Sequence, residues 1–109
     1  MQIIQAQQRE RTPNAHGVQA QMLLNTDPVQ TVMITLQPGE SLKSHVTPVD
    51  VFFYGLEGEG IVEIGDERAS MNRDDLVHSP RDIPHRLLNE NNNVFRFLVV
   101  KTPNPRMAK

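Results

Sequence analysis

The chain contains no cysteine and no tryptophan. The absence of thiols excludes disulfides, thiolate zinc sites, iron–sulfur clusters and cysteine nucleophiles. Any metal would therefore need nitrogen and oxygen ligands. The imidazoles available for this purpose are those of His16, His45, His78 and His85.

The sequence also lacks a basic excess and a long hydrophobic run. It has 11 basic and 13 acidic residues, a net charge of −2, and no basic cluster of the kind that nucleic-acid binders carry. No apolar stretch approaches the roughly 20 residues that cross a membrane. The N-terminal residues MQIIQAQQRER have neither the apolar stretch nor the cleavage pattern of a secretory signal. We expect a cytoplasmic protein that binds neither nucleic acid nor membranes.

Eight prolines and six glycines divide the 109 residues into short stretches, several of them rich in Val, Ile, Thr and Phe. Such stretches are typical of strands. The predicted strands are 18–24, 29–36, 49–57, 61–64, 76–79, 86–89 and 94–101. Many short strands at this spacing favour an all-β sandwich or barrel.

The length accommodates one domain, at roughly 100–200 residues per domain. We expect a single domain over 1–109, with a barrel core at about 17–101 and an N-terminal arm at 1–16. The C-terminal tail, 102–109, is expected to be loose or to lie across a neighbour.

Two segments carry chemically reactive residues at defined spacings. In the first, Gly39 is followed after five residues by His45, and the segment ends at Gly58; in the second, His85 lies between Pro80 and Asn89. These segments resemble the two sequence motifs of the cupin superfamily. The resemblance spans roughly residues 30–101 and implies an all-β, double-stranded β-helix (jelly-roll) cupin barrel.

The match departs from the cupin pattern at the metal ligands. The first cupin motif contains His-x-His followed by a glutamate, but here Thr47 replaces the second histidine and Val51 replaces the glutamate. Asp74 and Asp82 stand at glycine positions of the second motif. The resemblance implies His45 and His85 as metal ligands, which leaves a partly dismantled site.

Two further side chains are candidates to complete that site. Asp50 has the wrong alternation to share a face with His45, although a β-bulge near Pro48 would re-aim it. His78 would approach His85 if the intervening loop folds back. A mixed site of this kind suits zinc, iron, nickel, copper or manganese, so we expect a divalent metal that is labile or absent.

The same region predicts a ligand pocket. Lys43, His45 and Thr47 alternate along an extended segment and therefore share one face, and Lys43 would attract an anion. Thr47, Lys43 and Asn89 are the predicted pocket residues. His16, close to Pro13 and Gly17, is expected to be an exposed loop residue.

Two functions remain open from the sequence. The first is a binding protein that holds a small polar molecule in the barrel. The second is a metal-dependent enzyme of the isomerase, decarboxylase or dioxygenase type that cupins include. Apolar residues on both faces of Val51–Tyr54 and Val94–Val100 also predict a homodimer.

Overall fold

The structure, a computed structural model, describes residues 1–108 and consists almost entirely of antiparallel strands. The strands are β1 (Gln19–Thr26), β2 (Val29–Leu36), β3 (Asp50–Glu57), β4 (Glu59–Ile64), β5 (Glu67–Asn72), β6 (Leu76–Ser79), β7 (His85–Leu88) and β8 (Phe95–Thr102). Two 3₁₀ helices, η1 (Ala6–Gln8) and η2 (Pro105–Met107), flank them. No helix among residues 1–108 has the length and apolar character needed to cross a membrane.

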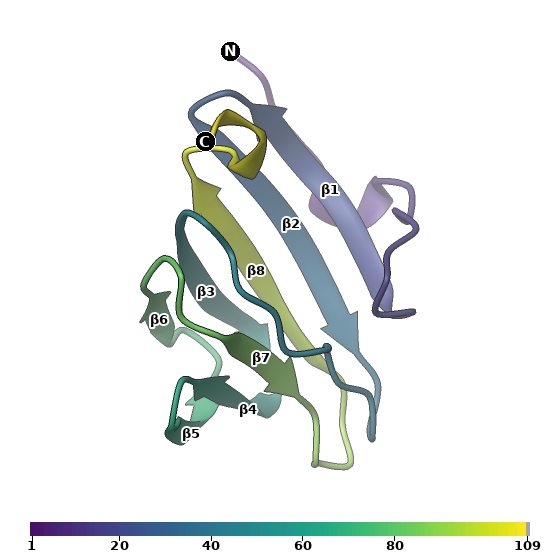
Figure 1. Ribbon diagram of the computed structural model, residues 1–109. Helices are drawn as coiled ribbons and strands as arrows, with labels where there is room; N and C mark the ends of the chain where they lie inside the picture. Colours follow the sequence, from purple (N-terminus) through teal and green to yellow (C-terminus); the bar gives the residue numbers. More distant parts are fainter. Residues whose placement is uncertain (109) are drawn as a thin grey trace.

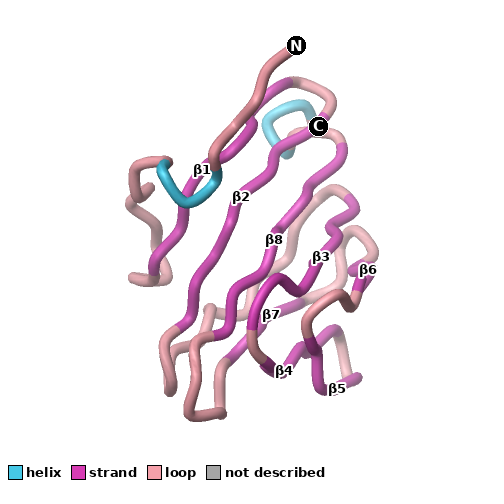
Figure 2. The backbone as a smooth tube through the Cα atoms, turned by 180° about the vertical axis from the view of Figure 1, so that it is seen from behind, coloured by secondary structure: helices cyan, strands magenta, loops and turns pink. Residues whose placement is uncertain are grey.

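The strands form two sheets that face each other (Figure 1). The larger sheet has the order β1-β2-β8-β3-β6 and the smaller has the order β5-β4-β7. Seen from behind, the segment that contains η1 crosses the outer face of the larger sheet at β1 (Figure 2). This arrangement is the double-stranded β-helix, so the expected fold class is confirmed.

The hydrophobic core lies between the sheets and is dominated by aromatic rings. Phe95 and Phe97 point inward from β8 and Phe53 points inward from β3, all three fully buried. Burying a side chain of this size stabilises the fold by roughly 1.5–3 kcal/mol. Gly60 is required here, because a Cβ at this position would overlap the ring of Phe95.

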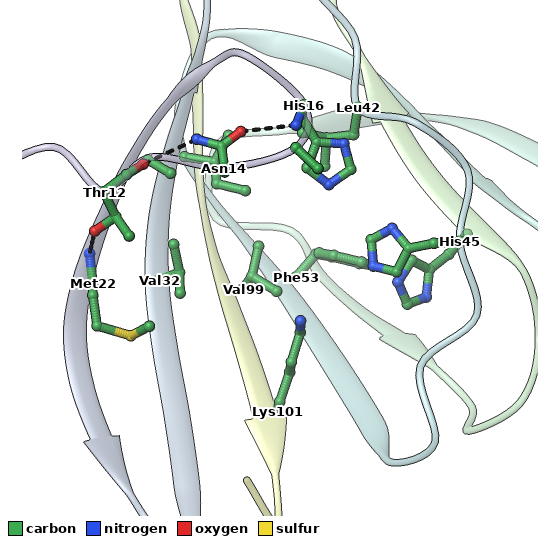
Figure 3. Close-up of a pocket in the computed structure, with 14 residues that line it drawn as sticks. Thr12, Asn14, His16, Met22, Val32, Leu42, His45, Phe53, Val99 and Lys101 are labelled. Carbon is green, nitrogen blue, oxygen red and sulfur yellow. Dashed lines mark hydrogen bonds between the residues drawn. The ribbon is translucent and has the colours of Figure 1, made fainter. Parts of the chain in front are cut away.

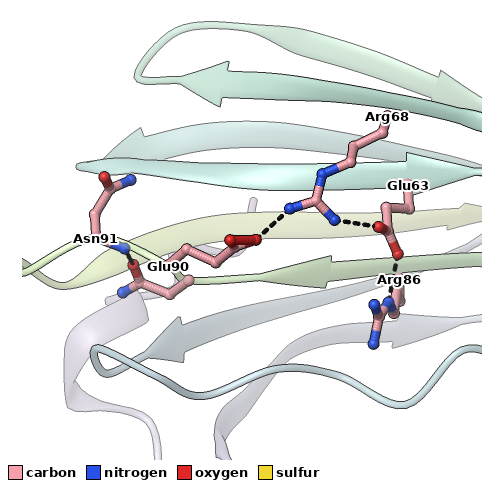
Figure 4. Close-up of polar contacts among 6 residues, drawn as sticks. Glu63, Arg68, Arg86, Glu90 and Asn91 are labelled. Atoms are coloured by element: carbon pink, nitrogen blue, oxygen red, sulfur yellow. Dashed lines mark hydrogen bonds and ion pairs between the residues drawn. The ribbon is translucent and has the colours of Figure 1, made fainter.

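The smaller sheet is held on its outer face by cross-strand ion pairs (Figure 4). Glu63 of β4 accepts hydrogen bonds from Arg86 of β7 and Arg68 of β5, which lie directly opposite it in the two ladders. These hydrogen bonds, of which the one from Arg86 has the largest effect, lower the pKa of the Glu63 carboxyl. Arg68 also pairs with Glu90. The ion pairs therefore link all three strands in one register.

Two segments differ from expectation. The strand β5 was not predicted because its sequence, ERASMN, shows no apolar alternation. The tail is ordered rather than loose: Asn104 is buried, its side chain donates to the Thr26 carbonyl, and its backbone N–H donates to the Asp27 carbonyl. Lys109, the last residue of the predicted tail, lies outside the described residues.

Candidate functional site

A cavity of about 270 Å³ opens between the inner face of the larger sheet and the segments that cover it (Figure 3). The N-terminal segment and the loop before β3 form the cover. Most of the lining is apolar, and the polar part consists of histidine, lysine, threonine and asparagine. The lining residues are Thr12, Asn14, Ala15, His16, Ala20, Met22, Val32, Ile34, Leu42, His45, Phe53, His85, Val99 and Lys101.

The fold brings His45 and His85 together at one side of this cavity. Their backbones exchange two hydrogen bonds, His45 N–H to the His85 carbonyl (3.2 Å) and the reverse (3.0 Å). Their rings lie 4.9 Å apart, centroid to centroid, and nearly perpendicular to each other. The two histidines that the sequence singled out therefore form one pair in space.

Both ring nitrogens of His85 are engaged by hydroxyl groups. The Ser79 hydroxyl lies 2.9 Å from Nδ1, and the Thr47 hydroxyl lies 3.3 Å from Nε2. Burial, reinforced by the charges of His45 and Lys101, lowers the pKa of His85 to about 4. His85 is thus neutral near pH 7, and its two hydroxyl partners take complementary donor and acceptor roles.

The backbone of Lys43 fixes the tautomers of two neighbouring imidazoles. Its carbonyl lies 3.3 Å from His45 Nδ1, and a carbonyl only accepts, so Nδ1 carries the proton and Nε2 presents a lone pair. Its N–H donates to His16 Nδ1 (2.8 Å), so Nε2 of His16 carries the proton. His16 is therefore a donor and His45 an acceptor, with ring centroids 5.4 Å apart.

His16 and Lys101 are site residues that the sequence did not predict, and His16 lines the cavity instead of standing in an exposed loop. Asn14 holds this loop in place: its Oδ1 accepts from the backbone N–H groups of His16 and Val18, and its amide donates to the Thr12 and Val18 carbonyls. Gly17 supplies the required positive φ of 69°. The sequence Asn-Ala-His-Gly is a turn signal, but it does not show that the turn packs against Lys43.

Lys101 points into the cavity from the inner face of β8 (Figure 3). Burial lowers its pKa. Within residues 1–108 its ammonium forms no ion pair and no hydrogen bond. Directly opposite, on β3, is Val51, the fully buried residue at the glutamate position of the first motif.

The three predicted pocket residues occupy different positions. Thr47 is buried against His85, as described above. Lys43 contributes its backbone rather than its side chain. Asn89 is buried and donates to the carbonyls of Leu36 and Asn93, which ties a loop to the end of β2 and places it outside the cavity lining.

His78 and Asp50 lie together on the outer surface, away from His45 and His85. His78 Nε2 is 3.7 Å from Asp50 Oδ1, and about half of each side chain is exposed. The same Asp50 oxygen accepts from the backbone N–H of Arg81. His78 faces outward because its neighbour Ser79 faces inward toward His85.

The donors present at the cavity do not fit a tightly bound divalent metal. Residues 1–108 contain no cluster of three or more His, Cys, Asp or Glu side chains placed to hold a metal ion. Of the two imidazoles at cupin ligand positions, His45 offers a free Nε2, whereas Nε2 of His85 is bonded to Thr47. Zinc sites normally combine three or four protein ligands.

This architecture, a small double-stranded β-helix with a cavity lined by motif residues, defines a class of barrel proteins. The family model of the Cupin domain matches residues 32–101, and the chain belongs to this family. It is 28% identical over 85 residues to an uncharacterized protein of Methanocaldococcus jannaschii, covering 77% of this chain and 73% of that protein.

Solved structures share the fold along most of the chain. The Thermus thermophilus protein TT1209 superposes with a TM-score of 0.83 at 28% identity, covering 94% of this chain and 98% of that one. An RmlC-like cupin from M. jannaschii gives a TM-score of 0.77 at 26% identity, covering 89% and 90%. A predicted oxalate decarboxylase of Thermotoga maritima, at 21% identity and a TM-score of 0.83 over 94% and 99%, shares the fold alone.

Proposed function

We propose that this cupin is a binding protein that holds a small molecule with a polar group in the cavity between its sheets. The observation that carries the proposal is the cavity itself, about 270 Å³ in volume. It combines an apolar wall with a few directed polar groups, as ligand sites do. His16 supplies a donor and His45 an acceptor, both oriented by the backbone of Lys43.

A cavity-filling variant tests this proposal. We expect a screen of small molecules by thermal shift and ¹⁵N NMR to find ligands that stabilise the wild-type protein. Ala20→Leu replaces a buried residue that lines the cavity. Ala69→Leu makes the same change at an exposed residue of β5 outside this cavity. The added bulk should abolish the ligand-induced shift in Ala20→Leu and leave it intact in Ala69→Leu. Equal shifts in both variants would place the ligand elsewhere and refute the proposal.

The alternative function is a metal-dependent enzyme. It is favoured by one observation, the free Nε2 of His45, whose Nδ1–H is held by a backbone carbonyl as in many metal-ligating histidines. We propose that any divalent cation is held weakly, by His45 and His85, because it would have to displace the Thr47 hydroxyl from Nε2 of His85. Elemental analysis of untagged protein after dialysis against a chelator should show no stoichiometric metal. Retention of one metal per chain would favour the enzyme.

A further inference from the structure

The ionisable side chains that line the cavity are all of one kind. His16, His45, His85 and Lys101 are basic, and no aspartate or glutamate is among the lining residues. Burial, His45 and Lys101 each lower the pKa of His16 and of His85, and burial lowers that of Lys101. The ammonium of Lys101 therefore faces the cavity without a counter-charge from the lining residues among 1–108.

The residue opposite Lys101 on the neighbouring strand offers no counter-charge either. In the ladder between β3 and β8, Lys101 is directly opposite Val51. A carboxylate at position 51 would reach the ammonium, but valine is apolar and fully buried. A partly buried ammonium without a counter-ion is costly, and an incoming anion would offset that cost.

The remaining lining is suited to an apolar group. Phe53, Val99 and Val32 form the wall of the larger sheet around Lys101 (Figure 3). The proton on Nε2 of His16 adds a neutral donor above this wall. A ligand that suits both the Lys101 ammonium and the apolar wall has one anionic group and an apolar remainder. The cavity volume limits it to a small size.

We propose that the cavity binds a small organic monocarboxylate, with its carboxylate on the Lys101 ammonium and its apolar remainder against Phe53 and Val99. This inference rests on the proposed function and specifies the ligand class.

Isosteric acid and amide pairs test the inference with the unmodified protein. Calorimetric titration with benzoate and benzamide, and with hexanoate and hexanamide, compares ligands of nearly equal shape. We expect each acid to bind at least about tenfold more tightly than its amide, since charge-assisted hydrogen bonds are roughly twice as strong as neutral ones. The advantage should shrink as salt concentration rises.

Variants identify the cation responsible. Lys101→Met keeps the length of the side chain and should remove the advantage of the acid without weakening amide binding. Arg73→Met removes an exposed cation that is outside the cavity lining and should leave the advantage unchanged. If Lys101→Met fails to fold, the acid and amide comparison in the wild-type protein still decides.

A second pair of variants gives Lys101 a counter-charge from the protein itself. Val51→Glu places an acid opposite Lys101 and should abolish benzoate and hexanoate binding, whereas Val51→Gln should retain a preference for the acids. Equal binding of acids and amides by the wild-type protein would overturn the inference while leaving small-molecule binding intact. If none of the four probes binds, the inference fails; the proposed function fails only if the broader screen also finds no ligand.

Discussion

Two residues, Thr47 and Val51, account for most of the difference between this cavity and a metal-binding cupin site. The Thr47 hydroxyl bonds to the ring nitrogen of His85 that a cation would otherwise use. Val51 removes the carboxylate and leaves Lys101 without a partner on β3. Both residues weaken metal binding, because each replaces a metal ligand of the cupin motif. Val51 in addition leaves the positive charge of Lys101 unpaired on β3.

Restoring the two donors should restore metal binding. We expect the double variant Thr47→His with Val51→Glu to bind Zn²⁺ or Mn²⁺ at least about 100-fold more tightly than the wild-type protein, since it presents three imidazoles and a carboxylate. Competition with a chromophoric chelator measures the affinity. The matched pair Thr47→Asn with Val51→Gln changes the same positions without imidazole or carboxylate. Equal affinities of the two double variants would contradict the prediction.

The buried imidazole of His85 predicts a pH dependence of stability. Its pKa is about 4 in the folded protein, against an ordinary value of 6.5. Between these values the unfolded chain binds a proton that the folded chain does not, so the free energy of unfolding falls as the pH drops from about 6.5 to about 4. Because the cavity admits solvent, we expect a loss of about 2 kcal/mol, below the roughly 3 kcal/mol that the full shift implies.

Urea denaturation at pH 7 and pH 4.5 measures this loss. The variant His85→Asn should be less stable at pH 7 but should lose less stability on acidification. His78→Asn alters an exposed histidine and should keep the wild-type dependence. An unchanged dependence in His85→Asn would assign the effect to other groups.

At the level of elements, the loop from Thr12 to Val18 positions His16, and Asn14 organises that loop through four hydrogen bonds. We expect Asn14→Ala to release the loop, weaken ligand binding about tenfold and lower stability by about 1–2 kcal/mol, since each hydrogen bond contributes of the order of 1 kcal/mol. Ligand titration and urea denaturation measure the two effects. The exposed Asn92→Ala is the control, and tight binding by Asn14→Ala would show that His16 needs no such support.

The same loop shows where prediction from sequence ends. Strands such as β2 and β8 were predictable because their apolar residues alternate, and the His45–His85 pair was predictable because each histidine lies in a motif. The place of His16 was not predictable, since it depends on a hydrogen bond to Lys43, 27 residues away along the chain. The strand β5 was not predictable either, since it forms by pairing with β4 and its own residues show no strand pattern.

At the scale of the whole molecule, the outer face of the larger sheet is unevenly covered. Over β1 and β2 the N-terminal segment covers it: Gln21 is buried and donates to the Arg9 carbonyl, and Met33 beside it is also buried. Over β8, β3 and β6 no such segment from residues 1–108 crosses the sheet (Figure 2). The outward side chains there include the apolar or aromatic residues Phe52, Tyr54, Leu98, Val100 and Leu76, together with the polar pair of Asp50 and His78.

This uncovered face is where we expect two copies of the chain to associate. Leu76, on the edge strand β6, is 65% exposed and continues the apolar surface of Tyr54. A standard interface buries roughly 800 Å² on each partner, a modest share of the 6564 Å² surface of this chain. We predict that light scattering at micromolar concentration gives twice the 12.4 kDa chain mass.

A charge on the uncovered face should separate the copies without unfolding them. Leu76→Glu introduces a carboxylate on an exposed position, so the chain should stay folded while its mass falls to that of a monomer. Ile83→Glu makes the same change at an exposed apolar residue outside this face and should remain dimeric. A monomeric wild-type protein would refute the dimer, and a dimeric Leu76→Glu would move its interface away from β6. Because the cavity is on the inner side of the same sheet, ligand binding should be equal in monomer and dimer, which separates this prediction from those for the cavity.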